Sequence, residues 1–157
     1  MSNASNSNDP TPAPSAEKTQ EDRVAELKAA VARAALDAGA SFVNDVSALT
    51  FDAGLKPLVA GKAAPICLMH AQGTPQTMQA DPRYDDVLLD VYDWLAARIS
   101  VAEAAGIARG QIGIDPGIGF GKTVAHNLAL LQRLSLFHTL GCPVLLGASR
   151  KRFIGTI

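Results

Sequence analysis

Short apolar runs alternate with stretches of helical periodicity along most of this chain, and this alternation limits its fold more than any other feature. Four of the apolar runs have the length of strands: residues 41–46, 65–70, 111–115 and 143–149. The helical stretches lie before and between them, at residues 24–40, 55–60, 84–105 and 126–140. Strands separated by helices pair in parallel through right-handed crossovers, so the sequence predicts an α/β fold with about four parallel strands.

The first 23 residues differ in composition from the rest of the chain. They are rich in Ser, Asn, Pro, Thr and Ala and contain almost nothing that a core could bury. We expect residues 1–23 to form a disordered, low-complexity tail. Residues 24–157 are then expected to form one domain.

Charge and cysteine content exclude several classes of protein. With 14 basic and 15 acidic residues, the net charge of -1 gives no field that would hold nucleic acid or an anionic membrane. No apolar run approaches the roughly 18 residues needed to cross a bilayer. Cys67 and Cys142 lack metal-ligand spacing and are expected to be buried small side chains in a reducing compartment. We therefore expect a cytoplasmic protein without nucleic-acid or membrane partners.

An acidic residue stands where the third expected strand meets a glycine-rich loop. Asp115 follows the apolar residues 112–114, and Gly117, Gly119 and Gly121 come directly after it. An ionised carboxylate at this position needs solvent, a partner or a ligand that donates hydrogen bonds. An Asp can also simply cap the following turn through its own backbone. The glycine spacing fits neither GxxxxGK[ST] nor GxGxxG, so we do not expect a nucleotide-binding P-loop.

Polar side chains follow every one of the expected strands. They are Asn44 and Asp45, His70 and Gln72, Asp115, and Ser149 with Arg150 and Lys151. Because ligands of parallel α/β folds bind at the carboxyl ends of strands, these residues predict one common site. Two alternatives stay open: Asn44 and Asp45 can form an Asx turn, and His70 can be a core histidine that donates to a backbone carbonyl.

Four motifs, in this order and spacing, resemble dihydropteroate synthase, a pterin-binding TIM-barrel family of folate biosynthesis. They are FVNDVSAL, LMHAQGTPQTMQ, IDPGIGFGKT followed by HNLALLQRL, and LLGASRKRFIG. The resemblance extends from about Val31 to the last residue. It implies a partial TIM (β/α)8 barrel. It also implies a transferase that condenses 6-hydroxymethyl-7,8-dihydropterin diphosphate with 4-aminobenzoate to give dihydropteroate.

The resemblance implies roles for individual residues as well. Asp115 and Asn44 match residues that contact the pterin ring, where a carboxylate facing two N–H donors forms a bidentate, charge-assisted pair. Lys151 matches a lysine that contacts the pterin and lies beside 4-aminobenzoate, so Asp115 and Lys151 are the expected catalytic residues. Phe120 matches a ring that packs at the aminobenzoate pocket. The other expected substrate contacts are Met69, Ser149 and Arg150, although a methionine can equally be plain core.

Parts of the family pattern have no counterpart in this sequence. Segments like LNVTPDSFSDGG and GGESTRPGA, a strand ending in VDT, and a final strand with Arg and His are missing. We therefore expect a fragment, roughly the middle half of a barrel, with little activity of its own. Mg²⁺ is implied by the family, but its ligand is not found here, so no metal ligand is assigned. Open barrel edges predict a homo-oligomer or association through those edges.

A non-catalytic module that binds a pterin or methyltetrahydrofolate is the alternative reading. The same pterin-contacting Asp and Asn serve in such domains. Residues 150–152 together with Lys122 form a basic cluster beside Phe120, which suits the carboxylate of aminobenzoate and a diphosphate. That cluster favours the synthase.

Overall fold

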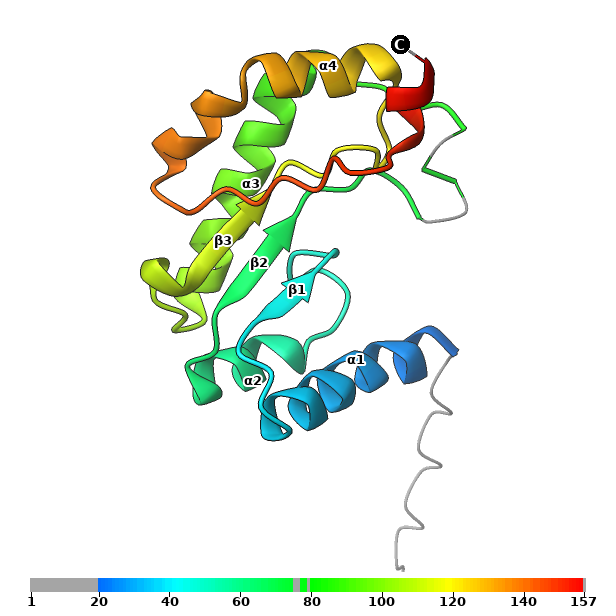
Figure 1. The fold of residues 1–157 in the computed structure, drawn as a ribbon. Helices are drawn as coiled ribbons and strands as arrows, with labels where there is room; N and C mark the ends of the chain where they lie inside the picture. Colours follow the sequence, from blue (N-terminus) through cyan, green and yellow to red (C-terminus); the bar gives the residue numbers. More distant parts are fainter. Residues whose placement is uncertain (1–19, 75–76, 79, 157) are drawn as a thin grey trace, which may run out of the picture.

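The computed structural model describes residues 20–74, 77–78 and 80–156, and it describes side chains from residue 27 to residue 155 apart from the same two gaps. The α-helices and strands are α1 (Gln20–Asp37), β1 (Val43–Asp45), α2 (Leu55–Lys62), β2 (Ile66–Met69), α3 (Val87–Ala104), β3 (Ile112–Asp115) and α4 (Val124–Gln132). Three 3-10 helices are η1 (Arg109–Gln111), η2 (Leu134–Leu140) and η3 (Arg152–Thr156). Helices α1 and α2 lie side by side, as do α3 and α4 (Figure 1).

The three strands form a parallel sheet in the order β1-β2-β3, which confirms the predicted parallel pairing. Asn44 is the register partner of Cys67, which in turn pairs with Gly113. Two residues further along, Met69 pairs with Asp115. Since side chains alternate between the faces of a strand, these five residues share one face of the sheet.

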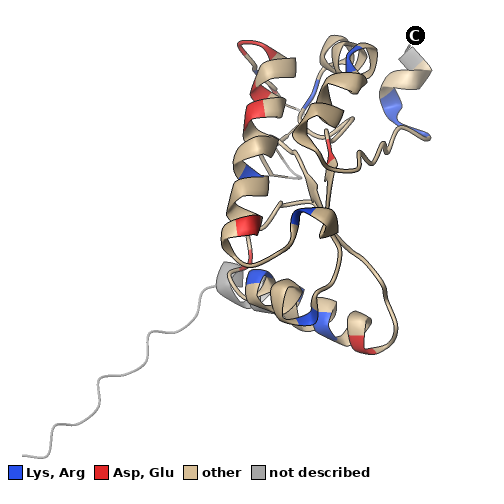
Figure 2. Ribbon diagram, turned by 90° about the vertical axis from the view of Figure 1, so that its left-hand side faces the viewer, with Lys and Arg blue, Asp and Glu red and all other residues tan. Residues whose placement is uncertain are grey.

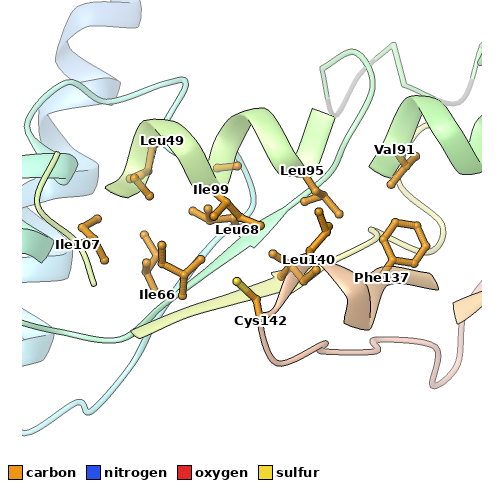
Figure 3. Close-up of a cluster of buried hydrophobic side chains, with 14 of the residues drawn as sticks. Leu49, Ile66, Leu68, Val91, Leu95, Ile99, Ile107, Phe137, Leu140 and Cys142 are labelled. Atoms are coloured by element: carbon orange, nitrogen blue, oxygen red, sulfur yellow. The ribbon is translucent and has the colours of Figure 1, made fainter. Parts of the chain in front are cut away.

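The opposite face of the sheet packs on α3 and forms the core. Ile66 and Leu68 of β2 lie against Leu95 and Ile99 of α3, and Phe137 of η2 closes one end of the cluster (Figure 3). All five side chains are at most 1% exposed. Burial of such large apolar side chains is the main force that holds the helices on the sheet.

The fourth expected strand, residues 143–149, is reduced to a single bridge between Ile114 and Val144. Ile114 N donates to Pro143 O (2.9 Å), and Leu145 N donates to Ile114 O (2.8 Å). A longer parallel ladder would need N–H donors at Pro143 and Pro116, and proline has none. The segment therefore runs beside β3 without becoming a regular strand (Figure 1).

Several expected helix boundaries also differ from the structure. The side chain of Asp86 accepts from the backbone N–H groups of the next turn, so α3 begins at Val87 rather than Tyr84. Residues 126–140 form α4 and then η2, separated at Arg133, instead of one helix. Helix α1 begins at Gln20, so residues 20–23 are helical and not part of a disordered tail. Residues 1–19 of the expected tail lie outside the described residues.

Across the part of the chain that the structure describes, no helix has the length and apolar character to span a membrane.

We expect two Phe to Ala substitutions, one in the core and one at the surface, to differ greatly in their effect on the free energy of unfolding. Phe137 is fully buried, whereas Phe51 is 48% exposed. We expect Phe137→Ala to lower the free energy of unfolding by about 3–5 kcal/mol, because it leaves a cavity in the core. The matched variant Phe51→Ala should lower it by less than about 1 kcal/mol. Urea denaturation measures both, and similar losses for the two variants would contradict the placement of η2 in the core.

Candidate functional site

The glycine loop, defined here as residues 116–122, lies across the carboxyl end of β2. Gly117, Gly119 and Gly121 have φ angles of +69°, +80° and +62°. A Cβ on Gly117 would overlap the carbonyl oxygen of His70, and one on Gly121 would lie 2.5 Å from Gln72 O. Only glycine allows both the positive φ and this close approach of two backbones.

Hydrogen bonds hold the glycine loop from several sides. Gly117 N donates to Asp115 Oδ1 (2.7 Å), and Gly119 N donates to Asn127 Oδ1 of α4 (2.8 Å). The Tyr84 hydroxyl, just before α3, donates to Gly121 O (2.7 Å). The loop is thereby joined to β3, α4 and the start of α3.

Lys122 is buried beneath the glycine loop. Its side chain is 3% exposed, and Nζ lies 3.0 Å from Gly117 O, 3.0 Å from Phe120 O and 2.9 Å from His70 Nδ1. An ammonium has three N–H donors, and these three acceptors use all of them. The expectation that Lys122 belongs to a basic cluster facing an anionic ligand is therefore wrong: its charge points into the protein.

Burial controls the protonation of Lys122 and His70. Burial lowers the pKa of Lys122 to about 7, and the negative charge of Asp115 opposes that shift. Burial also lowers the pKa of His70 to about 3, with the charge of Lys122 acting in the same direction. His70 is thus neutral and accepts from Lys122 through Nδ1. This confirms a core role for His70, with Lys122 rather than a backbone carbonyl as its partner.

Asp115 ends β3 with a carboxylate that is 6% exposed. Burial raises its pKa, while the Gly117 N–H and the charges of Lys151 and Lys122 oppose the rise. Oδ1 accepts from Gly117 N, so the turn-capping reading of Asp115 is correct for one oxygen. Within the described residues no donor is bonded to Oδ2, which faces Gly147. That second oxygen can accept from a ligand, as can the remaining lone-pair site of Oδ1.

Phe120 and Lys151 meet on the outer side of the glycine loop. Lys151 Nζ lies 4.0 Å from the centroid of the Phe120 ring, a distance typical of a cation–π contact. The alkyl stem of Lys151 passes over Gly119, where a Cβ would lie 3.1 Å from Cδ. Asp115, Phe120 and Lys151, which the sequence predicted to share a site, are therefore brought together.

The other expected ligand contacts lie around this group. Met69 is buried beside Asp115 on the same sheet face and outside the core cluster on α3. Asn44 is exposed on the same face, but two strands away at the sheet edge, where it lines an apolar groove of about 470 Å³ between β1 and α1. Ser149 and Arg150 are exposed in the turn before Lys151, and no hydrogen bond or ion pair joins either to Asp115.

Asp45, the neighbour of Asn44, has a structural role. It is buried and accepts from Ser47 N (3.0 Å), the Ser47 hydroxyl (2.6 Å) and Leu49 N (2.6 Å). This is the pattern of an Asx turn, so the turn reading is right for Asp45.

Sequence reasoning missed two residues that hold the site. Asn127 is 2% exposed although it is polar, and it lies on the same helical face as Leu130. A polar residue at a core-facing position of an amphipathic helix was the signal that could have found it. Tyr84 gave no comparable signal, because its contact with Gly121 joins residues 37 positions apart in the sequence.

The charged residues are distributed unevenly around these elements. Acidic residues gather toward the start of α3, whereas the C-terminal segment that carries Lys151 is basic (Figure 2). The basic residue of this segment that contacts the glycine loop is Lys151, through the ring of Phe120.

The residues of this site lie within a known sequence family, because the pattern of the pterin binding enzymes matches residues 24–157. The chain belongs to the pterin binding enzyme family. It is 43% identical to a dihydropteroate synthase of Escherichia coli (strain K12) over 130 residues, which are 83% of this chain and 46% of that protein. It is 46% identical to the dihydropteroate synthase of Mycobacterium leprae over 132 residues, again 83% of this chain and 46% of that protein.

Solved structures of the family agree with this assignment. Dihydropteroate synthase from Stenotrophomonas maltophilia superposes with a TM-score of 0.78 at 48% identity, over 82% of this chain and 48% of that one. The Thermus thermophilus enzyme in complex with 6HMPPP superposes with a TM-score of 0.76 at 43% identity, over 82% of this chain and 50% of that one. The expected family fold, part of a TIM barrel, is confirmed. This member of the pterin binding enzyme family spans about half the length of these relatives.

We expect opposite effects on the free energy of unfolding from a Gly to Ala substitution in the glycine loop and from one in α2. Gly117→Ala should lower the free energy of unfolding by at least about 3 kcal/mol, because the new methyl group meets the backbone of His70 and φ is positive. Gly61→Ala, in α2 with nothing within 4 Å, should raise it by up to about 1 kcal/mol. Denaturant unfolding measures both. Equal changes would show that the loop does not approach β2 so closely.

Proposed function

We propose that this chain provides the pterin-binding part of a dihydropteroate synthase site. Such a site condenses 6-hydroxymethyl-7,8-dihydropterin diphosphate with 4-aminobenzoate to give dihydropteroate. The observation that carries the proposal is the convergence of Asp115, Phe120 and Lys151 on one glycine loop. Relatives named dihydropteroate synthase support it, as do the Thermus thermophilus enzyme structures with 6HMPPP and with 4-aminobenzoate.

Asp115 is suited to recognise the pterin ring. A carboxylate has about four lone-pair sites, of which Gly117 N uses one, so Oδ2 and the remaining site on Oδ1 can accept two neighbouring N–H groups. Since little of the side chain is exposed, water competes weakly with such a ligand. A ring that lacks adjacent N–H donors would leave the buried carboxylate unpaired, and this makes Asp115 the source of specificity.

Phe120 and Lys151 are suited to the second substrate. The ring of Phe120 and the alkyl stem of Lys151 give an apolar surface for an aromatic acid, and the ammonium gives a positive charge at its edge. In the proposed reaction the amine nitrogen of 4-aminobenzoate forms a bond to the methylene carbon of the pterin. The bond from that carbon to the diphosphate oxygen breaks, the diphosphate leaves with the electron pair, and the nitrogen loses a proton.

The Mg²⁺ ion that the family resemblance implies stays an expectation, and no ligand for it is assigned among the described residues. Among them, no group of three or more His, Cys, Asp or Glu side chains could hold a metal ion. We therefore derive no step through a metal. The cations that the described part of the site offers are those of Lys151 and its basic neighbours, residues 150–152.

Other sequence-based expectations stay predictions. They are the cytoplasmic location, the absence of nucleic-acid partners, the homo-oligomer or edge association, and the low activity of the chain alone. A module that binds methyltetrahydrofolate is the second candidate. The basic cluster that favoured the synthase loses Lys122, because Lys122 points into the protein. Lys151 beside Phe120 is now the feature that favours the synthase over the methyltetrahydrofolate module.

Binding of dihydropterin diphosphate by the purified chain tests the proposal. We expect Asp115→Asn to weaken binding by about 10- to 100-fold, because the amide replaces a charged acceptor with a neutral one and adds an N–H₂ group opposite the ligand's donors. Asp93→Asn, at an exposed position on α3, should leave the Kd unchanged. Calorimetric titration measures both. Equal affinities of wild type and Asp115→Asn would contradict the pterin assignment, and tighter binding of methyltetrahydrofolate would favour the second candidate.

A further inference from the structure

We propose that Lys122 is a positioning residue: it fastens the glycine loop to the carboxyl end of β2 and thereby sets Asp115 and Phe120 for a ligand. The identity of the ligand in this proposal rests on the proposed pterin function. The fastening, by which we mean the three hydrogen bonds of Lys122, involves only this chain and can be measured without a ligand.

The contacts of Lys122 join the loop to a fixed point of the sheet. Two of its acceptors, Gly117 O and Phe120 O, lie on the loop, and the third, His70 Nδ1, belongs to the residue that follows β2. His70 is held in turn, because its backbone N donates to Asp115 O (2.9 Å) and its ring meets Trp94 edge-on at 4.9 Å. Lys122 therefore joins the backbone of the glycine loop to the carboxyl end of β2.

The two loop residues that Lys122 holds are also those that shape the ligand site. Gly117 donates to Asp115 Oδ1, and Phe120 carries the ring under Lys151 Nζ. A shift of either carbonyl away from Lys122 would turn the carboxylate or displace the ring. The Lys122 ammonium is buried and its three donors are used within the protein, so it acts on a ligand through these two residues.

The three contacts require the ammonium form. A neutral amine has two N–H donors and a lone pair, so one of the three acceptors would lose its partner and face the lone pair. The titratable groups that face Nζ are His70 after β2, Asp115 at the end of β3 and Tyr84 before α3, whose ring centroid lies 6.0 Å away. Because burial holds the pKa of Lys122 at about 7, the fastening should weaken as the pH rises through that value.

Imidazole nitrogen spectra of the chain labelled with ¹⁵N-histidine test the fastening directly. In the wild type we expect His70 Nδ1 to give the signal of an unprotonated nitrogen that accepts a hydrogen bond, and this signal should shift as Lys122 titrates near pH 7. Lys122→Met, which keeps the length of the side chain, should move the signal toward that of a free nitrogen and abolish the shift. His70→Gln assigns the signal. Lys56→Met on α2 is the matched control and should change nothing.

Ligand binding gives the second readout. At pH 6 we expect Lys122→Met to weaken the binding of dihydropterin diphosphate at least about 10-fold. Between pH 6 and pH 8.5 the affinity of the wild type should fall, while that of Lys122→Met should stay level. A wild-type chain that binds no pterin would overturn the proposed function but leave the nitrogen spectra to decide on the fastening. If Lys122→Met does not fold, a wild-type His70 signal without a hydrogen bond or a shift near pH 7 still overturns the inference.

Discussion

The backbone contact between the glycine loop and the end of β2 is the constraint on which the rest of the site depends. Gly117 lies so close to His70 that no side chain fits between them. This contact covers the carboxyl end of the sheet. As a result, Asp115 and Lys122 are both removed from water, although each carries a charge in its ordinary form. This burial beneath the glycine loop raises the pKa of Asp115 and lowers that of Lys122.

Phe120 separates two lysines with different tasks. Its carbonyl accepts from the buried Lys122, and its ring lies under the ammonium of Lys151 on the outer side. Both charges help to keep Asp115 ionised. The ammonium of Lys122 is bonded within the protein, whereas that of Lys151 lies on the side of the loop where we propose that the ligand binds. Asp115 at the end of β3, Phe120 in the glycine loop and Lys151 in the C-terminal segment thus place a carboxylate, an aromatic ring and a cation near one another, the set of groups that the proposed pterin and aromatic-acid ligands need.

Much of this arrangement could be predicted from the sequence. Apolar periodicity predicted the parallel strands, and the position of Asp115 at the end of an expected strand placed it at the carboxyl end of the sheet, where ligands of parallel α/β folds bind. The direction of Lys122 could not be predicted, because it depends on acceptors that come together only in the fold: two loop carbonyls and His70, which is 52 residues away. The short ladder beside β3 could have been predicted, because Pro116 and Pro143 lack the N–H donors that a longer ladder needs.

The proposed pairing of the Asp115 carboxylate with N–H donors of a pterin is tested by a cycle that changes the protein and the ligand together. Dissociation constants would be measured for wild type and Asp115→Asn, each with a dihydropterin and with its analogue that lacks the 2-amino group. We expect removal of the amino group to weaken binding to the wild type at least about 10-fold and binding to Asp115→Asn by much less. An equal loss in both proteins would show that the carboxylate and the amino group do not interact.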